Sequence, residues 1–82
     1  MDLEWQEIGW DSGNIERIAH DGVNLYVEFK KGPGYKYHNL PYEIFIRIMN
    51  KEVYSKSEGK PSHGATLNFL VVKAGYQSEQ YK

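Results

Sequence analysis

Hydrophobic and polar residues alternate along the first half of the chain, which is the pattern of β-strands that bury one face. The clearest run is residues 25–30, where Leu25, Val27 and Phe29 fall on the same side. A Lys-Gly-Pro-Gly segment follows and predicts a turn, because glycine permits positive φ angles and proline fixes its own. Residues 35–38 then predict the partner strand of a hairpin.

Two earlier segments are expected to extend this sheet. Residues 14–20 alternate imperfectly and predict a bulged strand, and the step from Asp21 to Gly22 favours a tight hairpin turn after it. Residues 3–10 mix apolar and acidic side chains and predict a short edge strand.

At Pro41 the period changes from that of a strand to that of a helix. Proline fits the first turn of a helix, where its missing N–H costs nothing. Residues 42–54 carry an apolar stripe at helical spacing, which consists of Ile44, Phe45, Ile48, Met49 and Val53. Residues 55–61 are polar and include glycine and proline, so they predict a mobile loop.

A second helix is predicted after this loop, with Ser62 or Thr66 as its cap and Gly75 near its end. Its apolar face would consist of Leu67, Leu70, Val71 and Ala74. Because several of these positions also suit a strand, a strand at residues 67–73 is the alternative, and we favour the helix. The polar residues 77–82 predict a frayed tail.

Strands followed by helices predict an α+β fold, with a small antiparallel sheet of three to four strands and two C-terminal α-helices. The 82 residues are expected to form one domain. The core of so short a chain is thin, and no cysteine is present to form a disulfide. We therefore expect a homo-oligomer, since association would bury further apolar surface.

Charge is distributed unevenly along the chain. Residues 1–28 carry seven acidic side chains and one arginine, whereas residues 29–82 carry nine basic and four acidic side chains. A basic face would attract phosphates; alternatively, the two halves neutralise each other in the folded molecule. No apolar run reaches the roughly 20 residues of a membrane span, and the acidic N-terminus differs from a signal peptide. We expect a cytoplasmic protein with no membrane partner.

Several short motifs together resemble the KTSC domain family, which is named for its place at the C-terminus of some lysyl-tRNA synthetases. The resemblance spans residues 12–76 and rests on Asn14-Ile15, Leu25-x-Val27-x-Phe29, Gly32, Tyr35-x-Tyr37, Leu40-Pro41-x-x-Ile44-Phe45, Ser62-x-Gly64 and Asn68. It implies an antiparallel sheet with helices after it and, from the synthetase context, RNA binding.

Two features depart from this family. Residues 54–61 form a longer connection between the helices, and Leu67 stands where the family has an aromatic residue before the asparagine. By size and architecture the chain is also similar to the phage Thoeris anti-defence proteins, which sequester signals derived from cyclic nucleotides. That similarity implies, as an alternative, a phage-type protein that sequesters such a signal or inhibits a host protein.

The tyrosines of the fourth predicted strand are the first candidate ligand site. Tyr35 and Tyr37 share one face and Lys36 lies on the other, because side chains alternate along a strand. The two rings could stack on bases, or they could cover the core beneath the helices.

The other candidates are polar or basic. Ser62 and His63 lie at the predicted start of the second helix, where they could bind an anion or simply cap the helix. The amide of Asn68 could read a base edge. The remaining candidates for phosphate contacts are Arg47, Lys60 and Lys73.

No residue pattern predicts a metal site, a cofactor or a catalytic group. The three histidines match no ligand spacing. We expect a non-enzymatic binding domain for RNA or a nucleotide-type ligand, with a protein-interaction module as one alternative. A small nuclease that uses His38 or His63 with Glu43 is the other.

Overall fold

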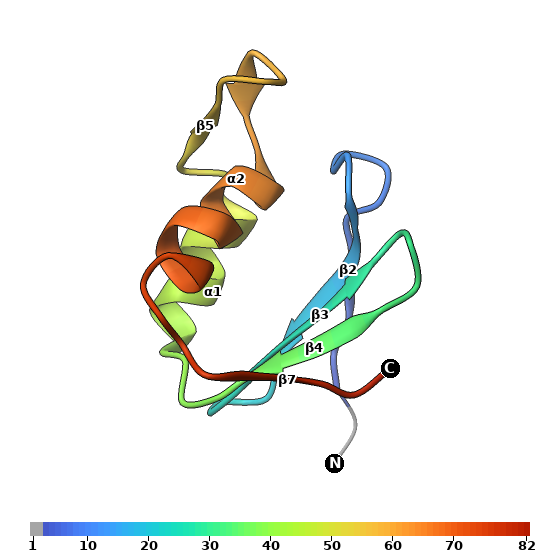
Figure 1. The fold of residues 1–82 in the computed structure, drawn as a ribbon, viewed down its shortest axis with the longest axis vertical. Helices are drawn as coiled ribbons and strands as arrows, with labels where there is room; N and C mark the ends of the chain where they lie inside the picture. Colours follow the sequence, from blue (N-terminus) through green and yellow to red (C-terminus); the bar gives the residue numbers. More distant parts are fainter. Residues whose placement is uncertain (1–2) are drawn as a thin grey trace.

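The computed structural model describes residues 3–82, which form a sheet on one side and a pair of helical segments on the other (Figure 1). The sheet is antiparallel throughout and contains five strands in the order β1-β2-β3-β4-β7. Its strands are β1 (Gln6–Glu7), β2 (Ile15–His20), β3 (Leu25–Phe29), β4 (Gly34–Tyr37) and β7 (Ser78–Gln80). The α+β class and the antiparallel sheet are therefore confirmed.

The alternating pattern of the sequence places one face of the sheet in the core. Ile18 on β2 lies opposite Val27 on β3, and both are fully buried. The register shifts between Ile15 and Arg17, which is the bulge predicted for residues 14–20. The bulge lets Ile15 and Ile18 both point into the core although they are three residues apart.

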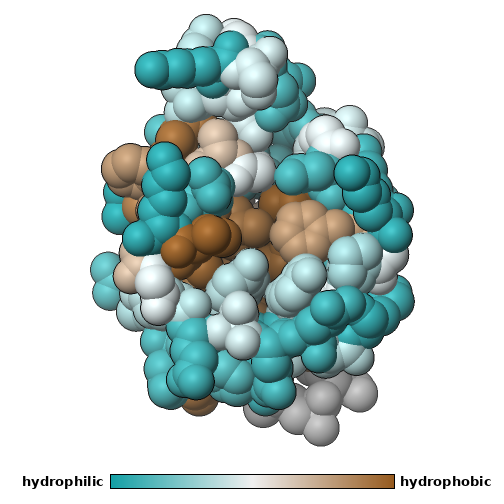
Figure 2. Space-filling model, in the orientation of Figure 1, coloured by the Kyte–Doolittle hydropathy of each residue, from teal (hydrophilic) through white to brown (hydrophobic). Residues whose placement is uncertain are grey.

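The helical layer covers that face. Helix α1 (Tyr42–Met49) follows Pro41 and buries Phe45 and Ile48. Apolar side chains gather in the hollow between the two layers, with hydrophilic residues around them (Figure 2). The core there is completed by Leu67 and Val71 from the second helical segment.

The second helical segment changes type along its length. Ser62 caps α2 (His63–Leu67), since its hydroxyl accepts a hydrogen bond from the Ala65 N–H at 3.2 Å. The chain then continues as the π-helix η1 (Asn68–Val72), with a hydrogen bond of 2.8 Å from the Lys73 N–H to the Asn68 carbonyl. The prediction of a helix at residues 67–73 is confirmed.

Two predictions about loops are wrong. Residues 77–82 were expected to fray, but β7 pairs with β4 and becomes an edge of the sheet. Within residues 55–61 the structure has a small hairpin, formed by β5 (Tyr54–Ser55) and β6 (Lys60–Pro61). Apart from the buried Ser55, the strand residues of both segments are polar or exposed, so no hydrophobic period marks these strands in the sequence.

No helix within residues 3–82 has the length and apolar character required to cross a membrane.

Candidate functional site

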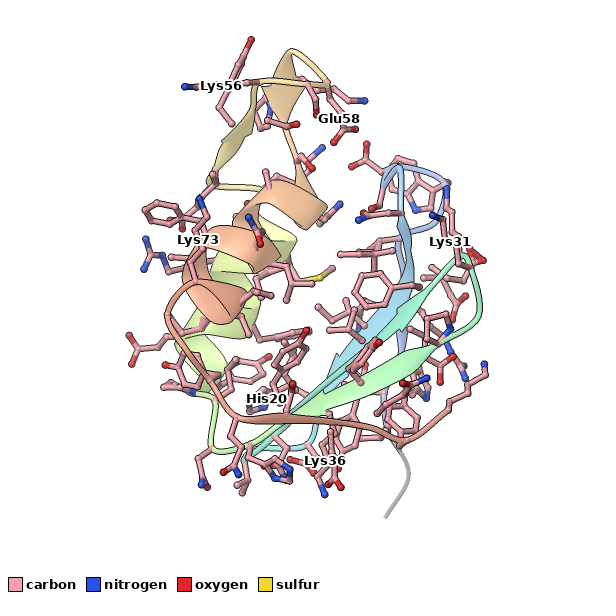
Figure 3. All side chains as sticks on the ribbon, in the orientation of Figure 1. His20, Lys31, Lys36, Lys56, Glu58 and Lys73 are labelled. Carbon is pink, nitrogen blue, oxygen red and sulfur yellow. The ribbon has the colours of Figure 1, made fainter. Side chains whose placement is uncertain are left out.

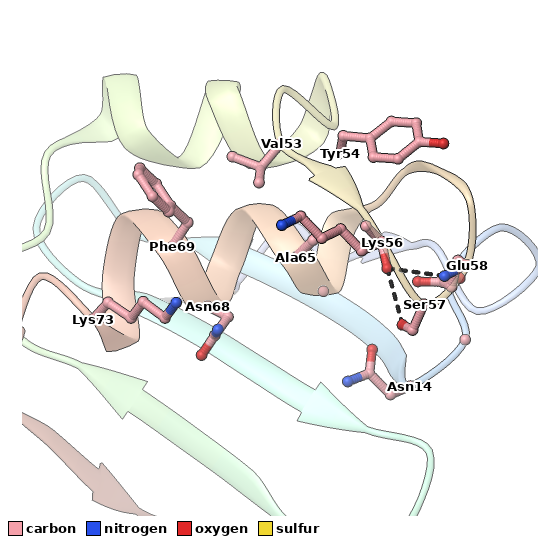
Figure 4. A pocket seen from close by; sticks show the side chains of 13 residues that line it. Asn14, Val53, Tyr54, Lys56, Ser57, Glu58, Ala65, Asn68, Phe69 and Lys73 are labelled. Atoms are coloured by element: carbon pink, nitrogen blue, oxygen red, sulfur yellow. Dashed lines mark hydrogen bonds between the residues drawn. The ribbon is translucent and has the colours of Figure 1, made fainter.

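A groove of about 770 Å³ lies between α2, the β5–β6 hairpin and the loop before β2 (Figure 4). This volume falls within the range of small-molecule sites, roughly 300–1,000 Å³. Its lining includes the polar side chains of Asn14, Ser55, Lys56, Ser57, Glu58, Asn68 and Lys73, together with the rings of Tyr54 and Phe69. Segments far apart in the sequence thus meet at one site.

The hairpin side of the groove is organised by one buried hydroxyl. Ser55 lies 8% exposed, and its Oγ is 3.2 Å from the Oγ of Ser57. The same oxygen accepts a hydrogen bond from the Glu58 N–H at 3.2 Å. These bonds hold the turn so that Ser57 and Glu58 stand at the groove (Figure 4).

The helix side presents Asn68, Phe69 and Lys73. In η1 the Lys73 N–H bonds to the carbonyl of the residue five positions earlier, so Asn68 and Lys73 lie on the same side of the helix (Figure 4). Phe69 is 58% exposed, so its ring is accessible to a ligand. The π-helical turn therefore places an amide and a cation next to each other.

The loop before β2 contributes Asn14. Its amide lies so close to α2 that a Cβ on Gly64 would be 2.7 Å from the Asn14 Oδ1. The Oγ of Ser12, a residue that is 6% exposed, lies 3.4 Å from the Asn14 Oδ1. A side chain at position 64 would therefore have to displace the Asn14 amide.

The groove carries a positive charge that the chain does not neutralise. Within the described residues, Arg17, Arg47, Lys51 and Lys82 form ion pairs, and His38 lies beside Glu79. Lys56 and Lys73 take part in none of them, and both line the groove. Glu58 is the acidic side chain of the lining. Two lysines with one carboxylate leave a net positive site that can attract a phosphate.

The structure places the predicted tyrosines in or beside the core. Tyr37 is 7% exposed and belongs to the core cluster. Tyr35 packs against that cluster and meets Phe29 edge to face, with ring centroids 5.9 Å apart. The alternative in which these rings cover the core is therefore confirmed for Tyr37.

Lys36 points away from the groove. It extends over the ring of Tyr26 at 5.7 Å and lies at the opposite end of the molecule from Lys56 (Figure 3). Arg47 on α1 forms an ion pair of 2.8 Å with Glu52, so its charge is partly neutralised. Lys60 is exposed on the hairpin, outside the lining of the groove.

Ser62 makes structural contacts, whereas the buried Nδ1 of His63 has no hydrogen-bond partner among the described residues. Ser62 is buried and caps α2. His63 is 4% exposed, and burial lowers the pKa of its imidazole, although the charge of Asp11 opposes that shift. Asp11 itself pairs with Lys51 at 2.7 Å, which lowers the pKa of the carboxyl. Of the predicted site residues, Asn68 and Lys73 line the groove.

The sequence alone does not mark Asn14, Lys56, Glu58 or Phe69 as ligand contacts. The sequence does contain one indication that Asn14 lies at a site. Asn14 belongs with Gly64 and Asn68 to the motifs that resemble the KTSC family, and the three residues lie together at the groove. The Nε2 of His38, a candidate for nuclease chemistry, lies 3.1 Å from the Glu79 Oε1. In the part of the chain that the structure describes, no three acidic or histidine side chains could share a metal ion.

A scan of the chain against models of protein families finds no match, and a search of curated proteins finds none either. The resemblance to the KTSC family stays a prediction that rests on the quoted residues alone.

Proposed function

We propose that this chain is a non-enzymatic binding domain for a nucleotide-type ligand, either free or as part of RNA. The ligand would occupy the groove beside α2. The observation that carries the proposal is the meeting of two amides, two lysines without an ion pair and an exposed aromatic ring in one groove of ligand size.

Each of these groups matches a part of a nucleotide. Lys56 and Lys73 suit the phosphate, which binds to proteins mainly through Lys, Arg and polar donors. The amides of Asn14 and Asn68 can form hydrogen bonds with base edges. Phe69 offers a ring on which a base can stack, a contact worth about 1–3 kcal/mol.

The proposed site differs from the one expected from the sequence at Tyr35, Lys36 and Tyr37. A stacking platform needs an exposed ring face, and Tyr37 has almost none. The exposed Phe69 takes over that role at the groove. Asn68 and Lys73 keep the roles that the sequence predicted for them.

The test is a calorimetric titration of the protein with nucleoside 5′-monophosphates, a cyclic dinucleotide and a short single-stranded RNA. Binding of one of these ligands, weakened at least threefold by Lys73→Ala, supports the groove as the site. The order of affinities separates a free nucleotide, a cyclic signal and RNA as the source of the phosphate.

A matched control is Lys36→Ala, which removes a lysine on the far face of the sheet. It should leave the affinity unchanged within about 0.3 kcal/mol, as expected for a distant surface residue. If Lys36→Ala weakens binding as much as Lys73→Ala, the groove is not the site. If none of the ligands binds at millimolar concentration, the proposed function is wrong.

A further inference from the structure

The β5–β6 hairpin supplies one wall of the groove but has little structure of its own. Of residues 54–61 only Ser55 is buried, and the hairpin projects past the start of α2 (Figure 1). A two-stranded hairpin is at best marginally stable in isolation. The place of Lys56, Ser57 and Glu58 at the groove therefore depends on how the base of the hairpin is fastened.

Both legs of the hairpin are fastened to α2 through one hydroxyl group. The Thr66 Oγ1 accepts a hydrogen bond of 2.9 Å from the Val53 N–H, on the leg that enters the hairpin. The same hydroxyl donates a bond of 2.8 Å to the carbonyl of Ser62, on the leg that leaves it. The Ser62 N–H completes the ring with a bond of 3.1 Å to the Val53 carbonyl. Because Thr66 is fully buried, its hydroxyl is shielded from water.

These contacts exceed what a threonine in a helix ordinarily makes. A helical threonine often donates its hydroxyl to the carbonyl four residues earlier, and the bond to Ser62 is of this kind. The bond from Val53 has no such explanation, because it reaches a segment thirteen residues away in the chain. Val53 lines the groove and Thr66 does not, so Thr66 can act on a ligand only through the residues that it holds.

We infer that Thr66 is a positioning residue of the groove, whose hydroxyl holds the base of the hairpin so that Lys56 stands at the ligand. The inference rests on the proposed function, since Lys56 is one of the two lysines offered there to the phosphate. Without the hydroxyl the Val53 N–H loses its acceptor and the two legs are free to shift against α2. Lys56 lies beyond these legs, so a small rotation at the base displaces it, while Lys73 on the other wall stays in place.

The test repeats the calorimetric titrations with nucleoside 5′-monophosphates, a cyclic dinucleotide and a short single-stranded RNA on two variants of Thr66. Thr66→Val keeps the branched shape but removes the hydroxyl, and affinity should fall about fivefold, the effect of one lost hydrogen bond. Thr66→Ser keeps the hydroxyl and should bind within about twofold of the parent protein, as expected when the contact survives. If Thr66→Val does not fold, Thr66→Cys takes its place, because a thiol is only a weak acceptor.

A double-mutant cycle shows whether Thr66 acts through Lys56. In a Lys56→Ala background, Thr66→Val should weaken binding by less than about twofold, because the group that it positions is already gone. Ile18→Val controls for lost stability, since it removes a fully buried carbon from the sheet and should leave the affinity unchanged. Thermal unfolding establishes that each variant is folded at the temperature of the titration.

The outcomes separate the two proposals. If a ligand binds and Lys73→Ala weakens it, but Thr66→Val binds like Thr66→Ser, the groove is the site and the role of Thr66 is wrong. A loss in Thr66→Val that Ile18→Val matches, or that adds in full to the loss in Lys56→Ala, also overturns that role. If none of the ligands binds, the proposed function fails and the role of Thr66 fails with it.

Discussion

The Glu28 carboxylate lies on the face of the sheet that turns away from the helices, and it finds its hydrogen-bond partners within the chain. The groove beside α2 differs, because it presents its amides and lysines to solvent. Glu28 is 7% exposed and accepts hydrogen bonds from Arg17 at 2.8 Å, Tyr81 at 2.9 Å and Lys82 at 3.2 Å. In the groove, Lys56 and Lys73 form no ion pair with a described residue.

This difference distinguishes polar groups that stabilise the fold from polar groups that remain free to bind a ligand. The Glu28 cluster contains charges and aromatic rings, as a binding site would, yet its groups serve to fasten β7 and the C-terminus to the sheet. Groups in the groove are held in place but keep a free donor or charge. Substitutions around Glu28 should therefore change stability, and those in the groove should change binding.

The largest effect is expected from Glu28→Ala. It leaves Arg17, Tyr81 and Lys82 without their common partner. Because the Arg17 and Lys82 side chains are partly exposed, the loss should fall below the roughly 3–5 kcal/mol of a fully buried pair, at about 2–3 kcal/mol. Urea unfolding should show this loss of stability. Nucleotide affinity, measured where the variant is fully folded, should be unchanged; a tenfold weaker affinity would mean that the two regions are coupled.

The pH dependence of stability should come next in size. Hydrogen bonding from Arg17, with further bonds from Tyr81 and Lys82, lowers the pKa of Glu28 from 4.5 to about 2. Since the folded-state pKa lies below the unfolded one, the ionised carboxylate stabilises the fold fully above pH 4.5. This contribution, about 1–2 kcal/mol after solvent screening, should be lost as the pH falls towards 2.

Unfolding in urea at pH 6, 4 and 2.5 measures this effect when the protein is compared with Glu28→Gln, which cannot ionise. The gap between the two proteins should narrow as the pH falls. A gap that stays constant over this range would show that the charge of Glu28 contributes nothing.

A smaller loss is expected at Gly34, which lies under the ring of Tyr81. A Cβ there would be 2.8 Å from the Tyr81 Cζ, so Gly34→Ala must displace the ring from Glu28. We expect a loss of about 1 kcal/mol, typical of a substitution that disturbs one local contact, and faster hydrogen exchange at the Tyr81 N–H. Gly13→Ala is the matched control, since its Cβ would make only ordinary contacts. An equal loss of stability in Gly13→Ala would show that the contact with the Tyr81 ring is not the cause.

The smallest effects on stability are expected in the groove. Asn68→Ala and Lys73→Ala remove exposed side chains that form no ion pair with a described residue, so stability should change by less than about 0.5 kcal/mol. Nucleotide affinity should nevertheless fall, and the affinity of the parent protein should weaken as salt increases. Equal loss of stability and affinity would show that these side chains support the fold.

Much of the fold follows from the sequence because its main elements bury a regular stripe. Leu25 and Val27 mark β3, and Phe45 and Ile48 mark α1. The strand β7 has no such stripe: Ser78, Glu79 and Gln80 are all exposed, and the segment is held by backbone pairing with β4 and by the bonds of Tyr81 and Lys82 to Glu28. Local patterns therefore identify elements that pack through side chains and miss those held by the backbone.

The groove was harder to predict for a related reason. Lys73 and Asn68 are recognisable candidates because a lysine suits a phosphate and an asparagine amide suits a base edge. Glu58 and Asn14 become neighbours of that segment only when the hairpin and the loop before β2 fold against α2. Tyr37 shows the converse, since a conspicuous aromatic residue on a regular strand was needed for the core.

The most direct measurement is a two-dimensional NMR titration of the labelled protein with GMP, followed through backbone and asparagine side-chain amides. We expect the chemical-shift changes to concentrate at Asn14, Gly64, Asn68 and Lys73, with the signals of Lys36 and Glu28 unchanged. Shifts that concentrate on β4 and the outer face of the sheet, with the groove unchanged, would contradict this expectation.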